Sequence, residues 1–138
     1  MSATPNVVDP ARRKSVLLIA ANAAVSPTTG WPVGFWWSEL THPYWTFTEA
    51  GYAVEIRSPN GGALTADTYS DPEDASGYSA HDLLSLGFKH SPTHAALIAN
   101  TPSLDDVRVA DYDAVFVTGG QSPMIRSEEH TSELQSRL

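Results

Sequence analysis

Apolar residues recur along the chain in patterns that predict alternating strands and helices. Residues 15–20 and 114–118 are short, almost wholly apolar runs, which is the pattern of central strands covered on both faces. Residues 52–56 alternate between apolar and polar positions and predict a third strand. Over residues 35–50 the apolar positions lie three and four residues apart, which predicts a helix that ends at Gly51.

The remaining segments predict loops, a leader and two further helices. Residues 26–32 and 63–77 are rich in turn-forming residues, so we expect irregular structure there. Residues 81–88 predict a short helix, and residues 91–100 predict another that begins with a capping serine and a proline. Residues 1–13 are polar and aperiodic, which indicates a disordered leader. The order of elements is typical of an α/β domain, and we expect a flavodoxin-like parallel sheet with flanking helices.

Composition narrows the classes of function. The chain has 138 residues and is 41% hydrophobic, which fits one small domain with a real core. The net charge of −8 disfavours nucleic acid and anionic membrane surfaces, because both bind through basic patches. The chain has no cysteine. A disulfide, a zinc–thiolate site and a cysteine nucleophile are therefore excluded from this chain.

One apolar run near the N-terminus has to be weighed as a targeting signal. Residues 16–21 follow the basic residues 12–14, and residues 21–23 match the small-residue pattern of a signal-peptidase site. The run is short and is equally typical of a buried parallel strand. No run approaches the roughly 18 residues that a membrane-spanning helix needs. We therefore expect a cytoplasmic protein that does not bind membranes.

Glu39 is the candidate catalytic acid or base. It lies near the start of the predicted helix among large apolar residues, which we expect to bury its carboxylate and to favour its protonated form. Pro43 has no amide hydrogen for the Glu39 carbonyl, so we expect a local distortion of the helix. The alternative is that Glu39 only interacts with the helix dipole in the first turn.

Gly119 and Gly120 are candidates for binding an anion. They follow the apolar strand of residues 114–118, and ligands of open parallel sheets bind beyond the carboxyl ends of the strands. Two glycines at this place can present backbone amides to a developing oxyanion. The alternative is a plain tight turn.

We predict no metal site. His90 and His94 have a metal-ligand spacing, but a predicted helix starts between them and no third ligand converges on them. Asp71, Glu73 and Asp74 lack the glycine and the spacing of an EF-hand loop, so we expect a solvated acidic loop. Four tryptophans are expected to pack in the core and at its rim rather than to stack nucleic-acid bases: Trp31, Trp36, Trp37 and Trp45.

Several segments together carry a family resemblance. They are residues 34–44, 48–52, 58–62, 99–102 and 111–116 and the pair Gly119-Gly120. Taken jointly, they resemble the ThiJ/PfpI superfamily, which has the class I glutamine amidotransferase-like fold, and in particular its chaperone and glyoxalase III-like branch. The resemblance covers residues 14–124, and residues 34–44 are its most specific part.

The resemblance implies roles for individual residues. In the family, a cysteine at a strand-to-helix elbow is the nucleophile, and a histidine follows it. Glu39 occupies the place of a glutamate that hydrogen-bonds the thiol and moves a proton. Gly119 and Gly120 occupy the place of the diglycine of the oxyanion site, with Gly120 as the main carrier. The family usually has His-Gly after this pair, whereas this chain has Gln121-Ser122.

The resemblance also implies an activity. We expect the parent protein to be a cysteine-dependent glyoxalase III-like enzyme that converts methylglyoxal-type carbonyls without a cofactor. A stress-chaperone role and a homodimer are further expectations. The alternatives are an amidase or peptidase of the same fold, or a non-enzymatic holdase chaperone or binding module, because a fold alone does not choose between them.

The last residues of the chain do not continue the predicted domain. Residues 126–138 resemble the translation of a sequencing adapter, so we expect a non-native tail. Residues 14–125 would then be the N-terminal part of the family domain. The nucleophilic elbow of the family would lie beyond Gly120, so we expect the chain as given to lack its nucleophile and to be inactive.

Overall fold

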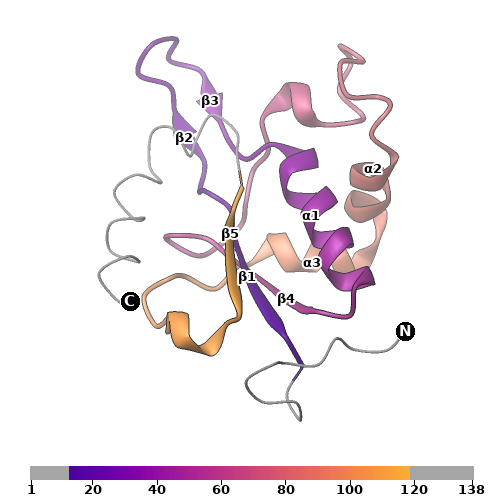
Figure 1. Cartoon of the computed structure of the whole chain (residues 1–138). Coiled ribbons are helices and arrows are strands. Elements are labelled where there is room, and N and C mark those ends of the chain that lie inside the picture. The colour runs from indigo at the N-terminus through magenta and orange to yellow at the C-terminus, as the bar shows by residue number, and fades with distance from the viewer. Residues whose placement is uncertain (1–12, 119–138) are drawn as a thin grey trace.

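A computed structural model describes residues 13–118, and its centre is a small parallel sheet (Figure 1). The strand order is β4-β1-β5, with β1 at Ser15–Ile19, β4 at Ala53–Arg57 and β5 at Ala114–Val117. Leu18 of β1 lies opposite Ile56 of β4 and Phe116 of β5. The three predicted strands and their parallel arrangement are therefore confirmed, with boundaries within one residue of the prediction.

Three helices lie together on one side of this sheet: α1 (Trp37–Glu49), α2 (Leu83–His90) and α3 (Pro92–Ala99) (Figure 1). In the first turn of α1, the side chains of Trp37 and Leu40 are buried and pack on Leu18 of β1. Full burial of such a side chain contributes about 1.5–3 kcal/mol to folding. The helix continues through Pro43, so the predicted distortion does not interrupt it.

The opposite face of β1 packs on the segment that follows α3. Successive side chains of a strand point to opposite faces. Leu17 and Ile19 accordingly form a second core with Leu104 and Val107. The central strand is thus buried on both faces, as its apolar run predicts. Strand β5 is different, because most of its side chains are exposed in the part of the chain that the structure describes.

The structure also contains elements that the sequence did not predict. The expected loop over residues 26–32 is the tip of a hairpin whose strands are β2 (Ala24–Val25) and β3 (Pro32–Val33). Strands of two residues are too short to show alternation. The expected excursion over residues 63–77 is irregular apart from the 3-10 turn η1 (Thr68–Ser70). A second 3-10 turn, η2 (Val109–Asp111), precedes β5.

Arg13, the last residue of the expected leader, is bonded to the domain. Its Nε donates to the Gly51 carbonyl at 2.7 Å and its Nη2 to the Tyr52 carbonyl at 3.1 Å. Residues 1–12 and the expected non-native tail at 126–138 lie outside the described residues. Within residues 13–118, no helix has the length and apolar character needed to cross a bilayer.

Candidate functional site

The carboxyl ends of the parallel strands meet at one edge of the sheet, where open α/β sheets bind their ligands. The Thr118 amide, directly after β5, donates to the Ile19 carbonyl at 2.9 Å. The Thr118 side chain is buried, and its Oγ1 has no hydrogen-bond partner among residues 13–118. Because an unpaired buried hydroxyl is costly, we expect this atom to hydrogen-bond a ligand or a residue outside the described range.

The loops after β1 and β4 form the rim of this edge, and Asn22 joins them. Its Nδ2 donates to the Gly61 carbonyl at 3.0 Å, and its Oδ1 accepts from the Asn60 amide at 2.7 Å. Ser58 Oγ lies 2.6 Å from Thr101 Oγ1, which ties the same rim to the end of α3. Side chains locked by such bonds keep the rim rigid.

The first turn of α1 lies beside the carboxyl end of β1 and is held there by the irregular segment of residues 63–77. The Gly34 amide donates to Asp67 Oδ1 at 2.5 Å, and the Phe35 amide donates to the Thr65 carbonyl at 3.1 Å. A Cβ atom at Gly34 would lie 1.8 Å from the Thr65 carbonyl oxygen. Only glycine therefore allows this close approach of two backbones.

Glu39 is exposed in the first turn of α1, so the expected burial of its carboxylate is wrong for the described chain. The large neighbours Trp37 and Leu40 are buried, but a helix turns by about 100° per residue, and they point to another face. The carboxylate has no hydrogen-bond or ionic partner within residues 13–118. Its catalytic role stays a prediction.

The side of α1 that carries Glu39 faces β5. Residues four apart on a helix share a face, so Glu39, Pro43 and Phe47 form one row, here called the Glu39 flank. The Phe47 ring lies 6.0 Å from the Phe116 ring of β5. Because α1 runs antiparallel to β5, the first turn of α1, which contains Glu39, lies toward the carboxyl end of that strand (Figure 1).

The predicted oxyanion residues follow directly after Thr118. Gly119 and Gly120 lie outside the described residues, so their part in the site stays a prediction. The described structure supplies the elements on which they would depend, namely the end of β5 and the first turn of α1.

The other sequence candidates lie away from this edge. His90 Nε2 is 2.6 Å from Glu73 Oε1, and the Lys89 ammonium is 2.8 Å from Asp71 Oδ2. These ion pairs attach the acidic loop of residues 71–74 to α2. His94 Nδ1 lies 2.7 Å from Ser91 Oγ at the start of α3. Among residues 13–118 no three potential ligands converge on a metal position.

Three of the four tryptophans pack in the core or at its rim as expected, but Trp31 does not. Trp37 is buried, Trp36 and Trp45 are partly buried, and Trp31 is exposed on the β2–β3 hairpin. The Trp45 ring lies 4.5 Å from the His94 ring, which fills the space between α1 and α3.

A second flank of α1 carries a polar group that sequence reasoning missed. His42 Nε2 lies 2.8 Å from Asp82 Oδ1, and Asp82 is only 6% exposed. Burial acts to raise the pKa of Asp82, but hydrogen bonds from Ser85 and His42 outweigh burial and hold the pKa below its usual value. The available signal was an aspartate three residues before Ser85 at a helix start, which is a capping pattern.

Comparison with solved structures identifies the fold. No protein-family profile and no curated protein sequence matches the chain. The Rapid Encystment Protein of 24 kDa from Francisella tularensis superposes with a TM-score of 0.68 at 27% identity, over 82% of this chain and 47% of that one. The chain has a ThiJ/PfpI-like fold.

A second solved structure shares this ThiJ/PfpI-like fold. Glyoxalase III from Candida albicans superposes with a TM-score of 0.59 at 21% identity, over 82% of this chain and 46% of that one. At this identity the likeness shows the fold alone. The chain spans about half the length of the solved structures that it matches.

Proposed function

We propose that the full-length protein is a cysteine-dependent, cofactor-independent enzyme of the glyoxalase III type that acts on small reactive carbonyls such as methylglyoxal. The observation that carries this proposal is the position of Glu39. Glu39 lies in the first turn of α1, on the flank that faces β5, and β5 leads into the buried Thr118 hydroxyl, which has no partner among residues 13–118. The ThiJ/PfpI-like fold supports the proposal, and one solved structure of this fold is a glyoxalase III.

In the proposed reaction, a cysteine thiolate attacks the aldehyde carbon and forms a hemithioacetal. The cysteine belongs to the part of the protein beyond this chain, which has none. The carboxylate of Glu39 moves a proton between the reacting carbon and oxygen atoms, which converts the hemithioacetal to a thioester. Backbone amides at Gly119 and Gly120 stabilise the negative charge on oxygen. Water then hydrolyses the thioester, which breaks the carbon–sulfur bond, frees the cysteine thiol and releases lactate. The net change adds one water to methylglyoxal, so no external oxidant or reductant takes part.

The test is consumption of methylglyoxal by the full-length protein without added glutathione. We expect turnover by the wild type and a loss of about 10²-fold in kcat for Glu39→Gln, the usual size of a general acid–base contribution. Glu49→Gln is the matched control, because Glu49 is an exposed glutamate at the other end of the same helix. Equal losses in both variants would refute the role of Glu39. Absence of turnover by the wild type would favour a non-enzymatic chaperone or binding module.

A further inference from the structure

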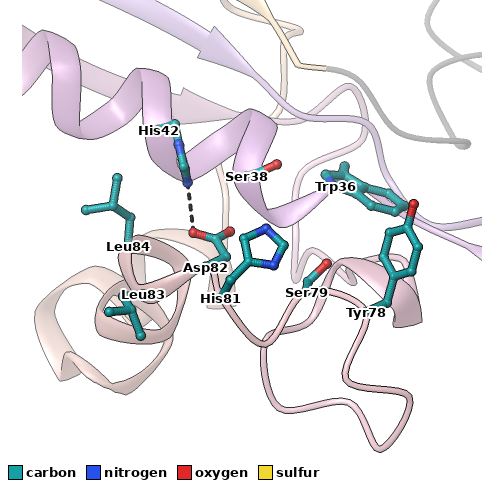
Figure 2. A pocket seen from close by; sticks show the side chains of 9 residues that line it. All are labelled: Trp36, Ser38, His42, Tyr78, Ser79, His81, Asp82, Leu83 and Leu84. Carbon is teal, nitrogen blue, oxygen red and sulfur yellow. Dashed lines mark hydrogen bonds and ion pairs between the residues drawn. The ribbon is translucent and has the colours of Figure 1, made fainter.

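A pocket lies on the side of α1 that faces away from the Glu39 flank. Its volume is about 660 Å³, within the range of sites for small molecules. Ser38 and His42, four residues apart on α1, line it from above, and the segment that leads into α2 closes it from below (Figure 2). We call this side of α1 the His42 flank. Glu39 does not line the pocket.

The polar floor of the pocket is already satisfied. Asp82 accepts from His42 Nε2 at 2.8 Å, from the Ser85 amide at 3.2 Å and from the Ser85 hydroxyl. Ser85 Oγ in turn lies 2.7 Å from the buried Thr41 hydroxyl. Both oxygens of the carboxylate are therefore used within the protein, and its negative charge is not free to hold a cationic ligand.

The walls of the pocket are aromatic and apolar. The rings of Trp36 and Tyr78 meet almost at a right angle, with centroids 6.3 Å apart, and form a corner at one end (Figure 2). Leu83 and Leu84 lie at the other end, and Leu83 is 71% exposed. Edge-to-face corners of this kind accept a third flat ring by stacking on one ring and meeting the edge of the other.

Three unpaired polar groups border the same space. The His81 imidazole stands between Asp82 and Tyr78 (Figure 2). No hydrogen bond joins this imidazole, the Ser38 hydroxyl or the Tyr78 hydroxyl to any other residue of the described range. Each of these groups can donate or accept a hydrogen bond, so together they can bind polar atoms at the edge of a ligand.

We propose that this pocket is a binding site for an uncharged, planar aromatic or heteroaromatic molecule with an amide-like hydrogen-bonding edge. The lining contains no lysine or arginine to hold an anion, and its one carboxylate is occupied by His42 and Ser85. Metal ligation is not favoured, since no group of three ligands converges within residues 13–118. The proposal is independent of the proposed enzymatic function, because none of its residues belongs to the Glu39 flank.

The charge preference is tested with three probes of the same shape. Benzamide is neutral, benzoate is an anion and benzamidinium is a cation. The readout is the change in amide chemical shifts of the 138-residue chain on titration at pH 8, above the usual titration range of histidine. We expect benzamide to bind with a Kd on the order of 1 mM, as suits a ligand of this size. The charged probes should bind at least about five-fold more weakly.

Two substitutions locate the binding. Tyr78→Ala removes one wall of the aromatic corner, and His81→Leu removes a hydrogen-bonding group while keeping apolar volume. Both residues are exposed, so neither substitution disturbs the core. We expect each to weaken benzamide binding about five-fold. His81→Leu should leave toluene binding unchanged, because toluene lacks the polar edge.

Trp31→Ala is the matched control, since Trp31 is an equally exposed aromatic residue outside this pocket. It should leave the Kd for benzamide unchanged. The proposal is overturned if benzamide causes no shifts, if either charged probe binds as tightly as benzamide, or if Trp31→Ala weakens binding as much as Tyr78→Ala does. None of these readouts depends on turnover, so they remain valid whatever the result of the methylglyoxal assay.

Discussion

The two flanks of α1 carry chemistry in opposite ways. On the Glu39 flank, the acidic group is exposed and has no partner within residues 13–118. On the His42 flank, Asp82 is buried and fully hydrogen-bonded, and the groups around it are histidine, serine, tyrosine and leucine side chains. An exposed carboxylate that is not bonded within the protein can accept a proton from a ligand or donate one to it. A buried carboxylate whose oxygens are all hydrogen-bonded stabilises the fold, and a ligand must then be bound by the side chains around it.

The comparison also shows where each flank depends on the rest of the molecule. The Glu39 flank looks toward β5, whose outer side chains are exposed in the described chain. The His42 flank looks toward α2, with which α1 shares the hydrogen bonds of Asp82 and Ser85. The His42 flank is therefore complete within the described residues, whereas the chemistry proposed for the Glu39 flank requires groups outside them.

The largest expected effect comes from moving the start of α1, on which both flanks depend. Gly34→Ala places a methyl group against the Thr65 carbonyl, so the backbone must shift. We expect the free energy of unfolding to fall by about 3 kcal/mol, measured by urea denaturation followed by circular dichroism. The control is Gly87→Ala in α2, where a Cβ meets nothing within 4 Å and alanine is the better helix former. A smaller loss at position 34 than at position 87 would contradict the close approach.

The second effect separates the flanks. Asp82→Ala removes the cap of α2 and leaves the buried Ser85 hydroxyl, which also bonds the Thr41 hydroxyl, without its carboxylate acceptor. We expect a loss of about 2 kcal/mol in the free energy of unfolding. Asp74→Ala is the control, because the Asp74 carboxylate also accepts a backbone hydrogen bond, from the Ser76 amide, but in an exposed turn. It should leave the stability almost unchanged, and equal effects would argue against the buried network.

The third effect is a pH dependence that belongs to the His42 flank. The pKa of Asp82 is below its usual value of 3.8 in the folded chain, because hydrogen bonds from Ser85 and His42 outweigh burial. A lowered pKa stabilises the fold above the unfolded value and loses this contribution as the pH falls through the folded pKa. The difference in unfolding free energy between wild type and Asp82→Asn should therefore shrink below about pH 4. A difference that grows on acidification would contradict the assignment.

The smallest expected effect is on the Glu39 flank, where the carboxylate should contribute little to stability. Glu39→Gln should change the free energy of unfolding by about 0.5 kcal/mol or less, because only its interaction with the helix dipole is lost. The same denaturation experiment measures it. A loss as large as that of Asp82→Ala would mean that Glu39 is a structural residue and would count against its proposed role.

Much of the architecture was predictable from local patterns. The apolar run of β1, which is buried on both faces, and the spacing in α1 reflect how many faces of each element are covered. The apolar run of β5 and the alternation in β4 located the other two strands. Ser91 and Pro92 marked the start of α3 because proline fits the first turn of a helix. These signals act within one element, so the sequence carries them directly.

The burial of individual polar groups was not predictable in the same way. Glu39 was expected to be buried because its sequence neighbours are large and apolar, yet those neighbours point to another face of the helix. Asp82 and His42 are 40 residues apart, and nothing in either local pattern indicates that they meet. The hairpin of β2 and β3 was missed because two residues carry no periodicity.

The order of strands and helices, the parallel sheet and a carboxylate at the start of α1 were all evident in the amino-acid pattern. Periodicity and capping are local properties, and each is written within one stretch of chain. The packed fold was needed to show that Glu39 is exposed on the side of β5, while Asp82 is buried against His42 and lines a pocket on the other side. Contacts between distant segments depend on how the helices rotate as they pack, and that rotation follows from the shape of the whole core.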